Sequence, residues 1–174
     1  MIREVGGYKP LVHSTAYIHK TALIIGKVTI GKNASIWPYC VLRGDIAEIV
    51  IGDETNIQDN TVIHTNAGLP AILGKGISVG HGVILHGCTV KDHCIIGMGS
   101  ILLDGSIVET ESIVAAGAVV SPKSTIAKGS MAMGIPAKVT RALRPDEIEH
   151  IHWNAKEYLR LSEVYRKTYN RVRD

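Results

Sequence analysis

The stretch SILLDGSIVETESIVAAGAVVSPKSTI, residues 100–126, repeats its pattern every six positions. One register of this repeat holds aliphatic residues: Ile84, Val90, Ile96, Leu102, Val108, Val114, Val120 and Ile126. A second register holds only small residues: Gly76, Gly82, Cys88, Cys94, Ser100, Ser106, Ser112, Ala118, Ser124 and Ser130. A period of six fits neither a helix nor an alternating strand, but it suits a short strand followed by a turn. The stretch therefore predicts a parallel β-solenoid in which three such units form one triangular turn.

The same aliphatic phase continues toward the N-terminus through Val12, Ile18, Ile24, Ile30, Ile36 and Leu42. Short insertions interrupt it near residues 47–50 and 66–71. The length of the repeat predicts about six turns, or roughly 30 Å at about 4.8 Å per turn. A β-sandwich would not keep one fixed period for so long. We therefore assign residues 1–140 to the solenoid.

The pattern changes after GIPAKVTRALRP, residues 134–145. Residues 145–170 predict an amphipathic helix, with Ile148, Ile151, Tyr158 and Tyr165 near one face. About 22 helical residues at 1.5 Å each span nearly the height of the solenoid. We expect this helix to lie alongside the solenoid within a single domain.

Composition narrows the class of protein. A chain of 174 residues with 45% hydrophobic and 20% charged residues is large enough for one domain with a real core. The net charge of +3 is scattered and aromatics are only 5%, which argues against a nucleic-acid partner. No leader or membrane-spanning stretch is recognisable, so we expect no membrane partner and a cytoplasmic location.

Three histidines have a spacing that the solenoid makes meaningful. His64 and His86 fall on the same face one turn apart, about 4.8 Å, and zinc needs its ligand atoms within roughly 4 Å of each other. Small side-chain adjustments therefore bring both onto one ion. Within HGVILH, residues 81–86, five extended residues span on the order of 16 Å. If all three histidines are ligands, His81 must come from a neighbouring molecule, as in a three-fold ring; the alternative is that they are ordinary turn residues.

Four motifs resemble the γ-class carbonic anhydrases and their carbonic anhydrase-like hexapeptide-repeat relatives: LRGD (42–45), NIQDNTVIH (56–64), HGVILHGC (81–88) and GIPAK (134–138). The resemblance implies a left-handed parallel β-helix, a homotrimer and metal sites between subunits. It implies His64, His81 and His86 as ligands of Zn²⁺, with Fe²⁺ or Co²⁺ as alternatives. The activity it implies is reversible hydration of carbon dioxide to bicarbonate by a metal-bound hydroxide.

The resemblance extends to six further positions: Gln58, Asn56, Tyr158, Arg43, Asp45 and Asp59. Gln58 matches the family's active-site glutamine, which orients the hydroxide or a substrate oxygen, and Asn56 matches a polar position behind it. Tyr158 either reaches the pocket from the helix or only packs. The other three match residues that form ion pairs near the subunit interface, although turn charges of this kind are also common on surfaces.

One segment departs from the family pattern. TNAGLPAI, residues 65–72, contains no acid where the best-known members carry glutamates that relay protons. Hydration is therefore expected to be slow or dependent on buffer. Two other functions remain open: a non-catalytic trimeric binding or assembly protein stapled by metal, and a CoA-dependent acyltransferase. The short insertion lacks the histidine base that an acyltransferase would need.

Overall fold

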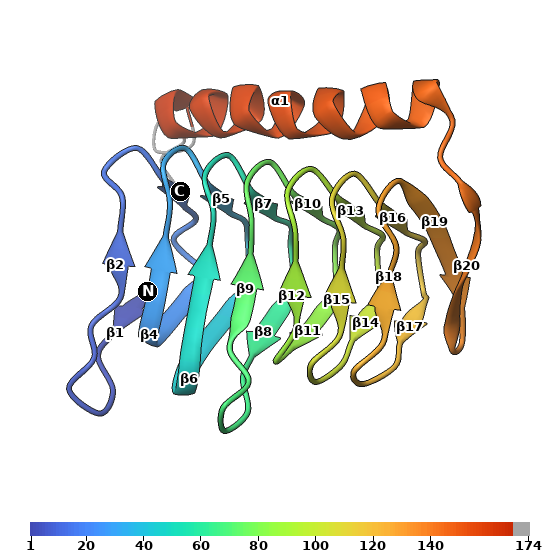
Figure 1. Cartoon of the computed structure of the whole chain (residues 1–174). Coiled ribbons are helices and arrows are strands. Elements are labelled where there is room, and N and C mark those ends of the chain that lie inside the picture. Colours follow the sequence, from blue (N-terminus) through green and yellow to red (C-terminus); the bar gives the residue numbers. More distant parts are fainter. Residues whose placement is uncertain (169–174) are drawn as a thin grey trace.

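The computed structural model describes residues 1–168 and shows a three-sided prism with one helix along a side (Figure 1). Strands rise on the near side, cross the top and descend behind while the chain advances to the right, so the coil is left-handed (Figure 1). One side of the prism contains seven parallel strands, which makes seven turns where the repeat predicted about six. The two insertions lengthen existing turns, one between β5 (Ser35–Ile36) and β7 (Asn56–Ile57) and one between β7 and β10 (Ser78–Val79). The left-handed parallel β-helix with a C-terminal α-helix is confirmed.

The three sides of the prism have distinct strands. The first, which we call the aliphatic face, contains β1 (Ile2–Arg3), β8 (Val62–His64), β11 (Ile84–His86), β14 (Ile101–Leu102) and β17 (Val119–Val120). The second, the mixed face, contains β2 (Leu11–Val12), β9 (Ala71–Leu73), β12 (Thr89–Val90), β15 (Ile107–Val108) and β18 (Thr125–Ile126). Two long strands, β4 (Leu23–Ile30) and β6 (Val41–Ile51), run around the corner between these faces and belong to both.

The third side is the helix-covered face. It contains β3 (Tyr17–Ile18), β5 (Ser35–Ile36), β7 (Asn56–Ile57), β10 (Ser78–Val79), β13 (Ile95–Ile96), β16 (Ile113–Val114), β19 (Ser130–Gly134) and β20 (Ala137–Ala142). All pairings on this face are parallel except that of β19 with β20, which are antiparallel. The hairpin of these two strands ends the solenoid (Figure 1).

Each turn contributes aliphatic side chains to a continuous core along the prism axis. Ile63, Leu85 and Leu102 succeed one another on one face and are all fully buried. The sequence placed Ile84 in this inward column, and that was wrong: Ile84 is 42% exposed. The buried residues Leu85 and Val90 are separated by five positions, one fewer than the regular spacing of six. Counting back six positions from Val90 therefore gives Ile84 instead of Leu85.

The small-residue column occupies the corners. Its serines are buried except for the half-buried Ser124, and several donate to a backbone carbonyl of the same corner, such as Ser100 Oγ to Gly97 O at 2.7 Å. The column does not extend to Gly76 and Gly82, because Ile77 and Val83 take the buried positions there. Between the insertion at 66–71 and the shortened side, therefore, the pattern is displaced by one residue.

The helix α1 (Pro145–Thr168) lies along the helix-covered face and contacts β3, β5, β7 and β10 (Figure 1). Its contact surface is partly aromatic: the Trp37 ring meets the rings of Tyr158 and Tyr165 edge-on, with centroids 5.5 and 5.0 Å apart. Residues 169 and 170, which the sequence assigned to this helix, lie outside the described residues. Among residues 1–168, no helix is both long and apolar enough to cross a membrane.

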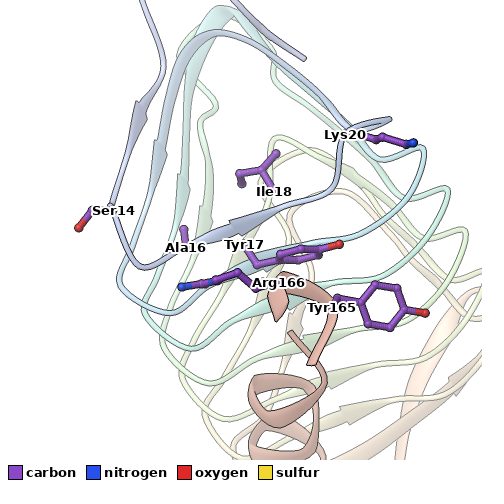
Figure 2. A pocket seen from close by; sticks show the side chains of 7 residues that line it. All are labelled: Ser14, Ala16, Tyr17, Ile18, Lys20, Tyr165 and Arg166. Atoms are coloured by element: carbon purple, nitrogen blue, oxygen red, sulfur yellow. The ribbon is translucent and has the colours of Figure 1, made fainter. Parts of the chain in front are cut away.

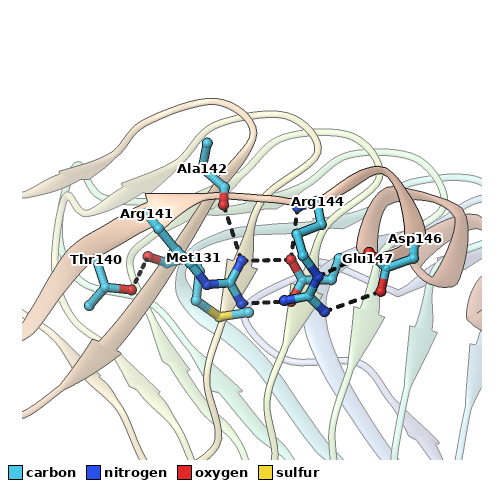
Figure 3. Close-up of polar contacts among 7 residues, drawn as sticks. All are labelled: Met131, Thr140, Arg141, Ala142, Arg144, Asp146 and Glu147. Atoms are coloured by element: carbon cyan, nitrogen blue, oxygen red, sulfur yellow. Dashed lines mark hydrogen bonds and ion pairs between the residues drawn. The ribbon is translucent and has the colours of Figure 1, made fainter.

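The start of α1 is held by a charged cluster (Figure 3). Both terminal nitrogens of Arg141, on β20, donate to the carboxylate of Glu147 at 2.7 Å. Glu147 also accepts the backbone N–H of Arg144 at 2.9 Å, which satisfies one of the unpaired donors at the helix N-terminus. These hydrogen bonds lower the pKa of Glu147 to about 2, with that from Arg141 the largest cause.

We predict that Glu147→Gln reduces stability at neutral pH and removes part of its pH dependence. The pKa of Glu147 is about 2 in the fold against an ordinary value of 4.5, so its contribution is complete above pH 4.5 and is lost as the pH falls toward 2. Urea unfolding of the wild type and the variant should differ at pH 6 and converge near pH 2. Glu149→Gln, which changes an exposed carboxylate on the same helix, is the control. A constant difference at all pH values would contradict this.

Candidate metal centre

The parallel pairing of β6, β8 and β11 stacks three polar side chains on successive turns. Arg43 pairs with His64, and His64 pairs with His86. Each follows an inward-facing residue, so all three side chains point away from the core at the corner that leads to the mixed face. The imidazole centroids of His64 and His86 are 5.1 Å apart, and His64 Nδ1 lies 3.2 Å from His86 Nε2.

A carboxylate holds the outer nitrogen of each of these two rings. Asp45 Oδ1 is 3.0 Å from His64 Nε2, and Asp104 Oδ1 is 2.5 Å from His86 Nδ1. Because an ionised carboxylate only accepts hydrogen bonds, each outer nitrogen carries the proton. The inner nitrogens, which face each other, both present lone pairs when the rings are neutral.

Two lone pairs 3.2 Å apart repel each other unless a cation lies between them. Nitrogens bound to tetrahedral zinc at about 2.0–2.1 Å are themselves roughly 3.3 Å apart. A carboxylate on the far nitrogen is also the usual support of a metal-bound histidine. The donors of His64 and His86 therefore fit a zinc-type ion, although among residues 1–168 no three His, Cys, Asp or Glu side chains of one chain come close enough to hold a metal.

His81 lies at the opposite corner of the aliphatic face. It follows β10 in the turn that leads into β11, whereas His86 ends β11. The His81 side chain is 47% exposed, and its Nδ1 lies 2.9 Å from Asp59 Oδ2, which leaves Nε2 as the unsupported nitrogen. One chain therefore carries two separate parts of the predicted ligand set, one supported by Asp45 and Asp104 and the other by Asp59.

A cavity of about 320 Å³ adjoins His81. Its lining combines residues from the solenoid with two from α1, and it includes Gln58, Ser78, Met98, Asn154 and Tyr158. The apolar part comes from Ile95, Ile96 and Ala116. The structure thus gathers His81, Gln58 and Tyr158 around one space, whereas His64 and His86 do not line it.

Asn56 fixes the orientation of Gln58. Its own amide donates to Ser78 Oγ at 2.9 Å, and its Oδ1 accepts from Gln58 Nε2 at 3.1 Å. Both amides are almost fully buried. The carbonyl oxygen of Gln58 is consequently the end available to a ligand in the cavity. Asn56 acts here through Gln58, because it is 1% exposed and does not line the cavity itself.

Tyr158 both packs and lines the cavity. Its ring contacts Trp37, and burial, followed by the negative charge of Asp59, raises the pKa of its hydroxyl. The phenol therefore remains protonated at physiological pH and can donate a hydrogen bond. The two alternatives that the sequence left open for this residue are compatible in the fold.

The predicted ion-pair residues separate into two groups. Arg43 Nη1 lies 2.5 Å from Asp45 Oδ2, beside His64, whereas Asp59 lies with His81 at the other corner. Desolvation alone would raise the pKa of Asp45, but hydrogen bonds from His64 and Arg43 outweigh it and lower that pKa. Within one chain, Asp59 is not a partner of Arg43.

Asp104 is a site residue that sequence reasoning missed. Hydrogen bonds from Asn66, and then from His86, lower its pKa. It lies 18 residues after His86, in the turn of the next coil, so the repeat itself carried the signal: a polar residue one turn beyond a candidate ligand. A search of the repeat for histidines alone did not reveal Asp104.

Another cavity, of about 360 Å³, lies at the first turn beside the C-terminal part of α1 (Figure 2). Its lining includes Tyr17, Lys20, Tyr165 and Arg166. None of the candidate site residues is among its lining residues. The chemistry predicted from the sequence therefore belongs to the opposite corners of the aliphatic face and not to this end of the prism.

Comparison with known proteins shows the family to which the chain belongs. No family model matches the chain. It is 49% identical over 154 residues to a probable carbonic anhydrase of Methanocaldococcus jannaschii, covering 88% of this chain and 97% of the relative. The chain belongs to the γ-class carbonic anhydrase and carbonic anhydrase-like hexapeptide-repeat family. The γ-class resemblance drawn from its motifs is thereby confirmed, and carbon dioxide hydration is supported as the family's general activity.

Two further similarities support this membership. The chain is 44% identical over 162 residues to the mitochondrial gamma carbonic anhydrase 2 of Arabidopsis thaliana, and it spans 58% of that relative's length. A hexapeptide transferase family protein from Anaplasma phagocytophilum has the same fold, with a TM-score of 0.92 and 43% identity over 94% of this chain and 97% of the other.

Proposed function

We propose that this protein hydrates carbon dioxide reversibly at three metal sites, each shared between two subunits of a homotrimer. The observation that carries the proposal is the pair of inward-facing imidazole nitrogens of His64 and His86, 3.2 Å apart and each backed by a carboxylate. When both rings are neutral, their facing lone pairs form a donor pair that a cation can occupy. Zinc is the proposed ion, with Fe²⁺ or Co²⁺ as alternatives.

The aliphatic face supports the trimer. Its outward-pointing positions form one unbroken ladder of aliphatic side chains: Leu23, Val41, Val62, Ile84, Ile101 and Val119. Val62 and Ile84 are 39% and 42% exposed in the single chain. A contiguous apolar surface of this kind on a folded protein marks an interaction site.

The other two faces lack such a surface. Three threonines interrupt the aliphatic residues at the outward positions of the mixed face: Leu11, Thr29, Val50, Ile72, Thr89, Ile107 and Thr125. The third face is already covered by α1. Only the aliphatic face is both apolar and open in the described residues, and it is the face bounded by the two parts of the ligand set.

A ring of three prisms can complete each site. When copies related by a three-fold axis pack through their aliphatic faces, the His81 corner of one meets the His64 and His86 corner of the next. His81 Nε2 then becomes the third nitrogen ligand, and its Nδ1 stays on Asp59 as the other two histidines stay on their carboxylates. Three histidines around zinc leave the open coordination position that a catalytic site requires.

The chain's own residues would position the reactants. A bound metal of this kind supplies Lewis-acid activation of water, lowering the pKa of that water to about 7. Gln58, oriented by Asn56, presents its carbonyl oxygen as an acceptor for the O–H of the attacking water. Tyr158 adds a donor, and Ile95 and Met98 give an apolar wall against which carbon dioxide can lie.

The proposed site lacks a free carboxylate to accept the proton that carbon dioxide hydration releases. The loop that follows β8 carries Asn66 in place of an acid, and this residue is engaged with Asp104. The carboxylates nearest the histidines accept hydrogen bonds from imidazole N–H groups and are therefore not free to take up the proton released by the water. External buffer is proposed to accept the proton.

The metal and the activity are tested together. Protein purified without oxygen should contain about one metal ion per chain, and carbon dioxide hydration should rise with buffer concentration and disappear when a chelator removes the metal. Gln58→Ala should retain the metal and lower kcat/KM on the order of 10²-fold. A metal-loaded trimer without activity in any buffer would favour the stapled binding protein, and acyl transfer from a CoA thioester would favour the acyltransferase.

The aliphatic face is tested by introducing a charge. Ile84→Asp should convert the trimer to folded monomers, since the charge would be buried at the interface without a partner. Light scattering gives the mass, and circular dichroism reports whether the β-helix remains. The matched change Thr89→Asp, on the mixed face of the same turn, should leave the trimer intact; dissociation by both variants, or by neither, would contradict the assignment of the faces.

The sharing of sites is tested by complementation. His81→Ala and His64→Ala chains should each form trimers without a complete ligand set. When the two chains are co-expressed, about three-quarters of randomly assembled trimers contain both, and each has one intact site, so metal content and activity should return to about a quarter of wild type. A mixture that remains inactive and metal-free would show that the three histidines act within one chain.

A further inference from the structure

We infer that Asp104 and Asn66 form a clamp that positions His86 for metal binding by fixing its proton on Nδ1. The inference rests on the proposed metal site at His64 and His86. Asp104 is a positioning residue, because it touches neither substrate nor metal and acts only through the imidazole.

The clamp joins three coils of the prism. Asp104 Oδ1 lies 2.5 Å from His86 Nδ1, and Asp104 Oδ2 accepts from Asn66 Nδ2 at 3.0 Å. Each carboxylate oxygen of Asp104 thus accepts one hydrogen bond, so the carboxylate cannot rotate without breaking a hydrogen bond. The imidazole is then held with Nε2 toward His64.

Asn66 explains what the short insertion does in this chain. The loop closes on itself through paired backbone hydrogen bonds between Asn66 and Leu69, at 2.9 and 3.2 Å. This closure holds Asn66 at the corner, where its side chain reaches Asp104, 38 residues later in the sequence. The loop therefore contributes to the orientation of a candidate ligand even though it carries no acid.

Two other aspartates, at the corner between the mixed and helix-covered faces, show what a purely structural residue does at the equivalent position of its own corner. Asp53 and Asp92, like Asp104, each lie two residues after a buried strand residue and above a glycine of the previous turn. Their Oδ1 atoms accept backbone N–H groups, from Lys32 at 2.7 Å and Lys75 at 2.8 Å. Asp104 lies above Gly87 in the same way, but its hydrogen bonds go to two side chains. Its bonds serve the histidine and not the turn.

The test compares Asp104→Ala, Asp104→Asn and Asn66→Ala with wild type, using Asp92→Asn as the control for a structural turn aspartate. Zn²⁺ affinity of the metal-free protein is measured by competition with a chelator. The tautomer of His86 is read from two-bond ¹H–¹⁵N spectra of the metal-free protein, with its signal identified by its loss in His86→Gln. Neither measurement depends on turnover.

We expect Asp104→Ala to weaken Zn²⁺ binding about 10- to 100-fold and to give His86 a mixture of tautomers. Asp104→Asn, which keeps a neutral acceptor, should restore part of the affinity, Asn66→Ala should cause a smaller loss, and Asp92→Asn should cause none. Wild-type affinity and an unchanged tautomer in Asp104→Ala would overturn the clamp and leave the proposed function standing. A wild-type protein that binds no Zn²⁺ would overturn the proposed function, and the tautomer spectra would still decide whether Asp104 fixes the proton.

Discussion

Parallel backbone pairing between successive turns is the constraint on which this structure depends. It holds equivalent residues at the strand spacing of about 4.8 Å, so whatever side chain occupies one position is repeated along the prism axis. Inside the prism this produces the stacked aliphatic core, because Ile63 and Leu85 are direct neighbours in the ladder. Outside it, the same spacing brings His64 and His86 together. The core and the candidate metal centre are thus two results of one register.

This origin explains what could be predicted from the sequence. The period and the terminal helix follow from patterns that extend over many residues, and small local errors do not disturb them; the left-handed coil was implied only by the family resemblance. The stacking of His64 on His86 was reachable because both follow strands of the same face. Ile84 was misplaced because a single short side shifts the residues between it and the preceding insertion by one position, and one residue decides between inside and outside. A repeat fixes the architecture more securely than it fixes local phase.

The partners of the histidines were harder to foresee. The motif LRGD indicated Asp45 as an ion-pair residue but not its hydrogen bond with His64, and Asp104 is in a turn one coil later, outside all four motifs. Acidic turn residues are frequent in this chain, and Asp53 and Asp92 serve only the backbone. Only side-chain coordinates distinguish a turn aspartate that supports a histidine from one that caps a loop.

The width of the prism keeps the three candidate ligands of a single chain too far apart for all of them to bind one ion. His81 and His86 bound opposite corners of one face, so in the proposed trimer two ligands come from one subunit and the third from the next. Metal binding and assembly are then linked, because an ion that binds only the completed site stabilises the trimer by mass action, and dissociation of the subunits lowers metal affinity equally. The carboxylates Asp45, Asp59 and Asp104 orient the donors before the partner arrives, which reduces the ordering cost of closing the ring. Apolar packing would hold the faces together, while the histidines at their edges would allow only the register that gives each cation three nitrogens.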